Sequence, residues 1–177
     1  MKRLIGILLF FLLTAATAQN QKLGFHFAEG KKKTVIPFKF QNNLIIVPVM
    51  LNGVVPLNFI VDTGVRTALL LDRTVSDMLR LNYTRRFVIS GPGGERLLTA
   101  LVTNNVSLDI GPDLRGRGHS ILVLEKDYLE LTRNIGMEVH GIIGYELFSR
   151  FIVKIDYERR ELIISLPERF RKPKNYF

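Results

Sequence analysis

Short apolar runs separated by turn residues dominate this chain. Residues 44–51 and 54–61 are two such runs, and Asn52-Gly53 stands between them. Asn-Gly between apolar runs is a strong hairpin signal, because both residues tolerate the positive φ angles that a tight turn between antiparallel strands requires. The pattern therefore predicts an antiparallel hairpin here and a fold built mostly of β-strands.

The remaining predicted elements are also short. Further strands are expected at residues 34–40, 86–90, 95–102, 106–110, 119–124, 152–155 and 161–164. Helical periodicity is confined to residues 73–81, 126–134 and 145–151. A loop rich in Gly and Arg is expected at residues 113–119. Together these patterns predict one compact, mostly β domain with two or three short helices.

The composition excludes several kinds of chemistry. With 47% hydrophobic residues and only 14 Gly and 7 Pro among 177, the chain is too apolar to be disordered. It has no Cys, which rules out disulfides, thiolate zinc sites, iron-sulfur clusters and cysteine nucleophiles. His26, His119 and His140 are scattered without metal-ligand spacing, so neither a metal nor a cofactor is expected.

The formal net charge of +9 does not indicate a nucleic-acid partner. Part of the excess lies in basic runs at residues 31–33 and 169–174, and charge runs of this kind are usually solvated. No basic helix or aromatic-interleaved basic strand is present, so nucleic-acid binding is not expected.

The first 18 residues have the pattern of a secretory signal peptide. Lys2 and Arg3 precede an apolar run at residues 4–13, and Ala16-Thr17-Ala18 supplies small residues for cleavage. The alternative is a membrane anchor, but ten apolar residues are short for a span of about twenty. We therefore expect a secreted or periplasmic protein with signal peptide 1–18 and no stable membrane span.

Asp62-Thr63-Gly64 is the candidate for chemistry. It directly follows the apolar run 57–61, where a carboxylate is costly unless it is stabilised. Asp and Gly are also favoured turn residues, so the triplet alone indicates an ordinary turn more often than a functional site. Its meaning therefore depends on the rest of the chain.

In that context the chain resembles the retropepsin-like aspartic peptidases, which are single-lobed proteins. Three segments carry the resemblance, in the family's order: Phe-Ile-Val-Asp-Thr-Gly at 59–64, Gly-Pro-Gly-Gly at 91–94, and Gly-Ile-Ile-Gly-Tyr-Glu-Leu-Phe at 141–148. The resemblance implies that residues 34–166 form a closed β-barrel lobe that carries a flap hairpin. An N-terminal segment, 19–33, precedes this domain, and a basic tail, 167–177, follows it.

The resemblance also implies roles for individual residues. Asp62 would be catalytic, and Thr63 and Gly64 would support the active-site loop. Gly91, Pro92, Gly93 and Gly94 would form the flap over a bound peptide, and Val65 and Arg66 are candidate substrate contacts. The implied function is that of an aspartic endopeptidase acting on peptide or protein substrates.

Only one Asp-Thr-Gly is present, whereas the family's chemistry uses two carboxyl groups. The resemblance implies that the second belongs to Asp62 of an identical subunit, or to a second lobe. Two alternatives remain at this point. One is a non-catalytic peptide-binding or interaction domain of the same fold, and the other is an unrelated β-barrel that binds a small apolar ligand.

A pH profile tests one departure from the family's pattern. The family usually has Ala or Ser after the Gly, and a Ser hydroxyl there favours the ionised Asp, whereas Val65 donates no such hydrogen bond. We therefore expect a less acidic activity optimum than that of pepsin-like enzymes. A maximum of peptide cleavage below about pH 4, close to the ordinary pKa of Asp, would contradict this expectation.

Overall fold

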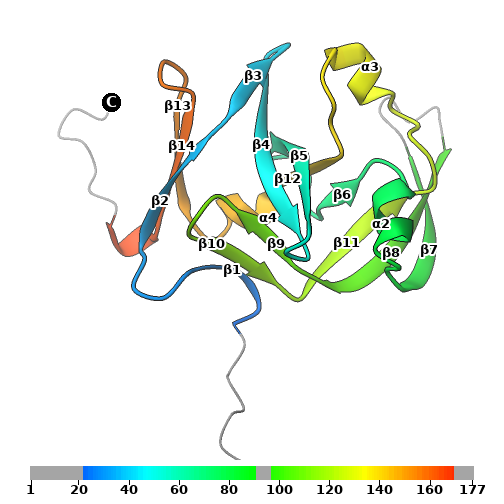
Figure 1. Ribbon diagram of the computed structural model, residues 1–177, viewed down its shortest axis with the longest axis horizontal. Coiled ribbons are helices and arrows are strands. Elements are labelled where there is room, and N and C mark those ends of the chain that lie inside the picture. The colour runs from blue at the N-terminus through cyan, green and yellow to red at the C-terminus, as the bar shows by residue number, and fades with distance from the viewer. Residues whose placement is uncertain (1–21, 91–96, 170–177) are drawn as a thin grey trace, which may run out of the picture.

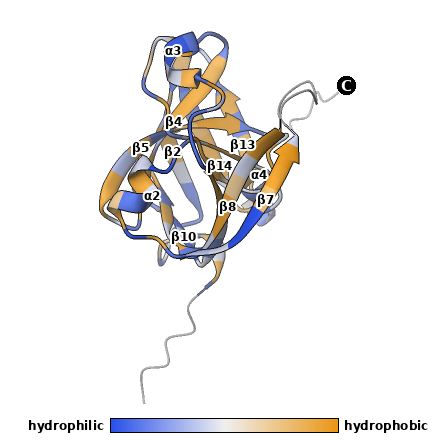
Figure 2. Ribbon diagram, turned by 90° about the vertical axis from the view of Figure 1, so that its right-hand side faces the viewer, coloured by the Kyte–Doolittle hydropathy of each residue, from blue (hydrophilic) through white to orange (hydrophobic). Residues whose placement is uncertain are grey.

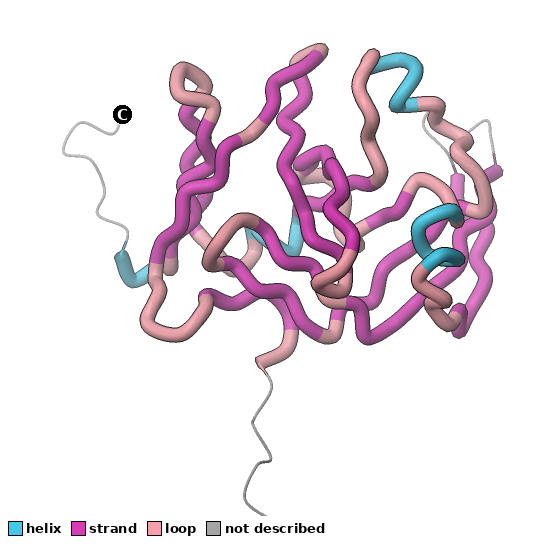
Figure 3. The backbone as a smooth tube through the Cα atoms, viewed as in Figure 1, coloured by secondary structure: helices cyan, strands magenta, loops and turns pink. Residues whose placement is uncertain are grey.

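The computed structural model describes residues 22–90 and 97–169 and confirms a mostly β fold (Figures 1 and 3). The strands are β1 (Gly24–Phe27), β2 (Lys33–Pro37), β3 (Lys39–Gln41), β4 (Leu44–Leu51), β5 (Val55–Asp62), β6 (Leu69–Leu70), β7 (Tyr83–Ser90), β8 (Leu97–Val106), β9 (Leu108–Ile110), β10 (Leu114–Arg117), β11 (His119–Leu124), β12 (Gly141–Gly144), β13 (Ile152–Asp156) and β14 (Glu161–Ser165). The helices are α2 (Thr74–Met78), α3 (Leu131–Ile135), α4 (Tyr145–Phe148) and a 3-10 turn, η1 (Pro167–Arg169).

The strands form two sheets. The larger has the order β1-β10-β9-β4-β5-β12-β6-β11-β8-β7, with β3 paired to β4, and the smaller has the order β13-β14-β2. The larger sheet curls as a half-barrel, and its strand order ends at β1 and at β7. The resemblance had implied a closed barrel. In Figure 1 the smaller sheet lies at the left and β7 and β8 lie at the right.

The predicted hairpin joins β4 to β5. Leu51 pairs with Val55, and Asn52 and Gly53 have φ angles of 49° and 69°, as the Asn-Gly signal requires. The Asn52 side chain also accepts a hydrogen bond from the Ser107 amide at 2.8 Å. The turn is thereby tied to the segment that leads into β9.

The expected loop at residues 113–119 is wrong, because most of it is strand β10. β10 pairs antiparallel with β1 and with β9. Gly111 and Gly118 have φ angles of 61° and 66° and allow the chain to turn at each end of β10. The glycines therefore end the strand on both sides, and β1 brings part of the N-terminal segment 19–33 into the main sheet.

The three helices occur where they were expected but are shorter. α2 ends before Arg80, which has a φ of 51°. α3 begins only at Leu131, because Asp127 accepts hydrogen bonds from the Leu129 and Glu130 amides and holds a non-helical turn. Within residues 22–90 and 97–169, no helix has the length and apolar character needed to cross a membrane.

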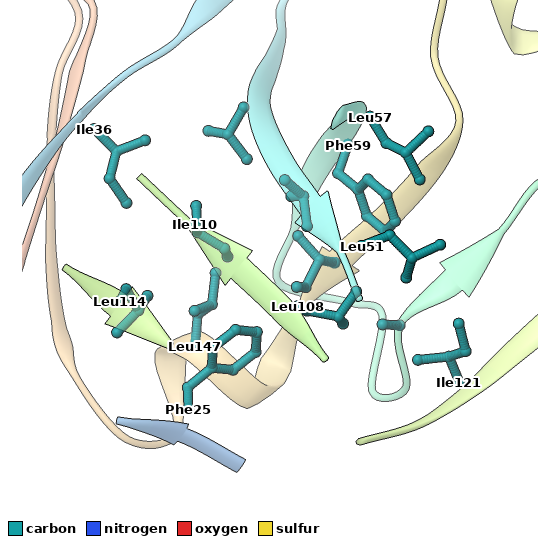
Figure 4. Close-up of a cluster of buried hydrophobic side chains, with 14 of the residues drawn as sticks. Phe25, Ile36, Leu51, Leu57, Phe59, Leu108, Ile110, Leu114, Ile121 and Leu147 are labelled. Carbon is teal, nitrogen blue, oxygen red and sulfur yellow. The ribbon is translucent and has the colours of Figure 1, made fainter. Parts of the chain in front are cut away.

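One hydrophobic core joins both sheets and α4. It contains Phe25, Ile36, Leu51, Leu57, Phe59, Leu108, Ile110, Leu114, Ile121 and Leu147, all of which are buried (Figure 4). Ile36 comes from the smaller sheet and Leu147 from α4. Because α4 directly follows β12, this packing also fixes the end of β12.

Candidate active site

Asp62 is the last residue of β5 and lies beside the end of β12. β12 runs parallel to β5, with Gly144 opposite Asp62, and antiparallel to β6, with Gly141 opposite Leu70. The chain therefore leaves β5 at Asp62, passes through residues 63–68 and returns as β6 on the other side of β12. The sequence places Asp62 and Gly144 far apart, and the sheet brings them together.

Local hydrogen bonds order the Asp62-Thr63-Gly64 turn. The Gly64 amide donates to Asp62 Oδ1 at 2.8 Å, and the Val65 amide donates to the Asp62 carbonyl oxygen at 3.2 Å. The Tyr145 amide donates to the Val65 carbonyl oxygen at 2.9 Å and so joins the turn to α4. The Gly64 bond orients the carboxylate and the other two order the backbone, while Asp62, Thr63 and Gly64 all remain exposed to solvent.

Glycine is required at Gly144 by close packing. A Cβ atom at this position would lie 1.6 Å from the carbonyl oxygen of Asp62, well inside van der Waals contact. A Cβ atom at Gly141 would lie 2.5 Å from the carbonyl oxygen of Leu69 on the other neighbouring strand. The glycines at both ends of β12 therefore allow it to fit between β5 and β6.

Val65 and Arg66 continue the same loop. Val65 is half-buried and Arg66 is exposed. The guanidinium carbon of Arg66 lies 5.5 Å from the centroid of the Tyr145 ring, within the range of a cation–π interaction. Sequence reasoning missed Tyr145 as a partner of Arg66, because the contact depends on the placement of β12 beside β5.

The flap residues Gly91, Pro92, Gly93 and Gly94 lie outside the described residues. The strands on either side of them are described, and β7 pairs antiparallel with β8 from Tyr83 to Ser90. In Figure 2, β7 is hydrophilic where it begins and apolar toward its end. Phe87 and Val88, in this apolar part, are both exposed.

A side-chain contact that the sequence did not reveal joins α4 to β11. The buried His119 places its Nδ1 atom 2.5 Å from Oε2 of Glu146, and its ring packs on Phe25 with centroids 4.4 Å apart. The His119 Nε2 atom has no hydrogen-bond partner, and Gly116 leaves room for it, since a Cβ there would lie 2.5 Å away. The contact between His119 and Glu146 therefore joins β11 to α4.

His140 also has a structural role, since it is hydrogen-bonded to the backbone of Asn58. Its Nδ1 atom accepts a hydrogen bond from the Asn58 amide at 3.2 Å, and its own amide donates to the Asn58 carbonyl oxygen at 2.8 Å. Among the residues that the structure describes, no three side chains of the His, Asp and Glu types are grouped closely enough to hold a metal ion.

Substitution of Gly144 tests the close packing around Asp62. We expect Gly144→Ala to lower the free energy of unfolding by about 3 kcal/mol or more, because the new Cβ and the Asp62 carbonyl oxygen must move apart. Gly136→Ala is the matched control. Gly136 has a φ of 73° but open space around it, so its substitution is expected to cost only about 1 kcal/mol of backbone strain.

Urea denaturation of the two variants measures both losses. Equal losses would show that β12 has room for a side chain at position 144, and the packing account of the turn would then be wrong.

A family model and one solved structure show what this chain is similar to. The family model described as aspartyl protease matches residues 47–147, a range that contains both Asp62 and Gly144. Among solved structures, the chain is similar to a retropepsin-like aspartic protease from Rickettsia conorii, with 20% identity over 82% of this chain and 96% of that one and a TM-score of 0.47. The search of curated proteins finds no match. Because the family match covers more than half of the sequence, the chain belongs to the aspartyl protease family.

Proposed function

We propose that the protein is an aspartic endopeptidase that works as a homodimer, with the Asp62 carboxyl groups of the two subunits paired in one active site. Family membership supports a peptidase-type function. The observation that carries the more specific proposal is the Asp62 turn. Its carboxylate accepts a hydrogen bond from the Gly64 amide, while Asp62 stays exposed to solvent.

The chemistry explains why one carboxyl group is insufficient. Hydrolysis of a peptide bond needs a base to activate water and an acid to protonate the leaving amide nitrogen. Aspartic proteases are the standard case of two adjacent carboxyl groups that share one proton, because two like charges at close distance resist ionising together. The ionised group then acts as the base and the protonated group as the acid.

A second copy of the chain provides the second carboxyl group most simply. The sequence contains a single Asp-Thr-Gly, and a two-fold axis beside the exposed turn would place the same residue of each subunit face to face. Thr63 is exposed beside Asp62, so its hydroxyl is free to approach the turn of the partner. The pairing would cover polar groups that a single chain leaves in water.

The proposed reaction balances without a cofactor. The ionised Asp62 takes a proton from water as the water oxygen attacks the peptide carbonyl carbon, and the protonated Asp62 of the partner subunit donates its proton to the carbonyl oxygen. In the resulting intermediate the carbon carries two hydroxyl groups. The carbon–nitrogen bond breaks as the now protonated Asp62 gives its proton to the amide nitrogen and the now ionised Asp62 of the partner subunit takes a proton from one hydroxyl group, which leaves a carboxylic acid and an amine. The substrate is expected to bind in an extended conformation, as peptides do when they line a sheet edge.

An Asp62→Asn variant tests this proposal. We expect its kcat on a mixed peptide library to fall by a factor of about a hundred to ten thousand, because Asn neither accepts the proton from water nor donates one. Asp156→Asn is the matched control. Asp156 also accepts a backbone hydrogen bond, from the Arg159 amide, but it is the last residue of β13, in the smaller sheet. Its substitution therefore removes the same charge without touching the Asp62 turn.

The assay should be done between pH 3 and 8, with the oligomeric state and thermal stability of each variant measured in the same buffers. Equal activity of wild type and Asp62→Asn would overturn the proposal. Absence of cleavage by a wild-type protein that is shown to be dimeric would favour the non-catalytic peptide-binding domain instead.

A further inference from the structure

We propose that Arg66 and Tyr145 form a subsite for an acidic side chain of the peptide substrate, near the scissile bond. The proposal rests on the function proposed above and adds a substrate class to it. The proposal is based on three observations about Arg66. It lies close to Asp62 in the chain, its side chain contacts Tyr145, and it has no carboxylate partner among the described residues.

The loop holds Arg66 close to the reacting groups. Arg66 follows Asp62 by four residues, so their Cα atoms are at most about 14 Å apart even for an extended chain. The hydrogen bonds from the Val65 amide to Asp62 and from the Tyr145 amide to Val65 fix the backbone directly before Arg66. The position of Arg66 relative to Asp62 is therefore set by the same contacts that order the catalytic turn.

The cation–π contact with Tyr145 restrains the Arg66 side chain. The guanidinium carbon lies 5.5 Å from the ring centroid, and Tyr145 as a whole residue is 47% exposed. A guanidinium held against an aromatic ring loses less freedom than an unrestrained side chain when it binds an anion. Arg66 is thus prepared to bind a planar anion such as a carboxylate.

The charge of Arg66 is not neutralised by a neighbour. Four other described arginines form ion pairs with carboxylates: Arg73 with Asp77, Arg86 with Glu125, Arg117 with Asp109, and Arg133 with Glu130. In the parts of the chain that the structure describes, no carboxylate lies within ion-pair distance of Arg66. A Glu or Asp side chain of the substrate would supply the missing partner through two parallel hydrogen bonds.

The position of the acidic residue follows from chain geometry. An extended peptide advances about 3.3 Å per residue, so Arg66 is within reach of side chains up to about four residues from the scissile bond. In a symmetric dimer, Arg66 occurs twice, once on each side of the paired Asp62 residues. We therefore expect acidic residues to be favoured on both sides of the cleaved bond.

A binding experiment tests the subsite independently of catalysis. The Asp62→Asn protein is immobilised and offered a mixed peptide library in two forms that differ only by Glu or Gln at fixed positions. We expect retention of the Glu form over the Gln form by about tenfold at pH 6, and loss of this preference when Arg66→Gln is added. The preference should also disappear below about pH 4, where the peptide Glu becomes protonated.

Cleavage by the protein with Asp62 intact provides the second measurement. The ratio of kcat/KM for Glu and Gln peptides is expected to be about ten for wild type and near one for Arg66→Gln, with a smaller loss for Arg66→Lys, which keeps the charge but not the planar fork. Arg159→Gln, which removes an exposed positive charge from the β13–β14 turn, is expected to keep the wild-type ratio.

The two measurements separate the two proposals. No preference for Glu peptides in binding or cleavage, or a preference that Arg66→Gln leaves intact, would overturn the subsite. Retention of Glu peptides that depends on Arg66, without cleavage by wild type, would support the subsite and overturn the proposed endopeptidase activity.

Discussion

The close contact between β12 and the end of β5 is the constraint on which the rest of the site depends. Gly144 lies directly against the Asp62 carbonyl oxygen, and Gly141 lies against the carbonyl oxygen of Leu69. With side chains at these two places, β12 would not fit between β5 and β6, and the loop of residues 63–68 would lose its support. The glycines therefore support the Asp62 turn although they have no functional side chain.

The same contact also explains why Asp62 and Arg66 lie in one supported loop. The Tyr145 amide, immediately after Gly144, holds Val65, while the Tyr145 ring supports Arg66. The contact between His119 and Glu146 and the burial of Leu147 hold α4 against the core. Asp62 and Arg66 are thus exposed side chains on a loop that is held by β12 and α4. This arrangement is compatible with the proposed binding of an extended peptide and of a second subunit.

Much of this architecture was predictable because its signals are local. Asn52-Gly53 predicted the first hairpin, and the apolar run before Asp62 placed that residue at the end of a strand. Strand β10 was missed because its Gly and Arg residues favour a loop, whereas pairing with both β1 and β9 stabilises a strand. The His119–Glu146 and Arg66–Tyr145 contacts join residues 27 and 79 positions apart and leave no periodic signal in the sequence.

Mixing of subunits tests most directly the claim that the active site needs two copies of Asp62. Wild-type protein is allowed to exchange subunits with a ninefold excess of Asp62→Asn protein, and peptide cleavage is measured at constant wild-type concentration. If each site takes one carboxyl group from each subunit, only about a tenth of the wild-type chains remain in active dimers, and activity falls to about a tenth. Activity that stays constant after complete exchange would contradict the account, because each wild-type chain would then be active without a second Asp62.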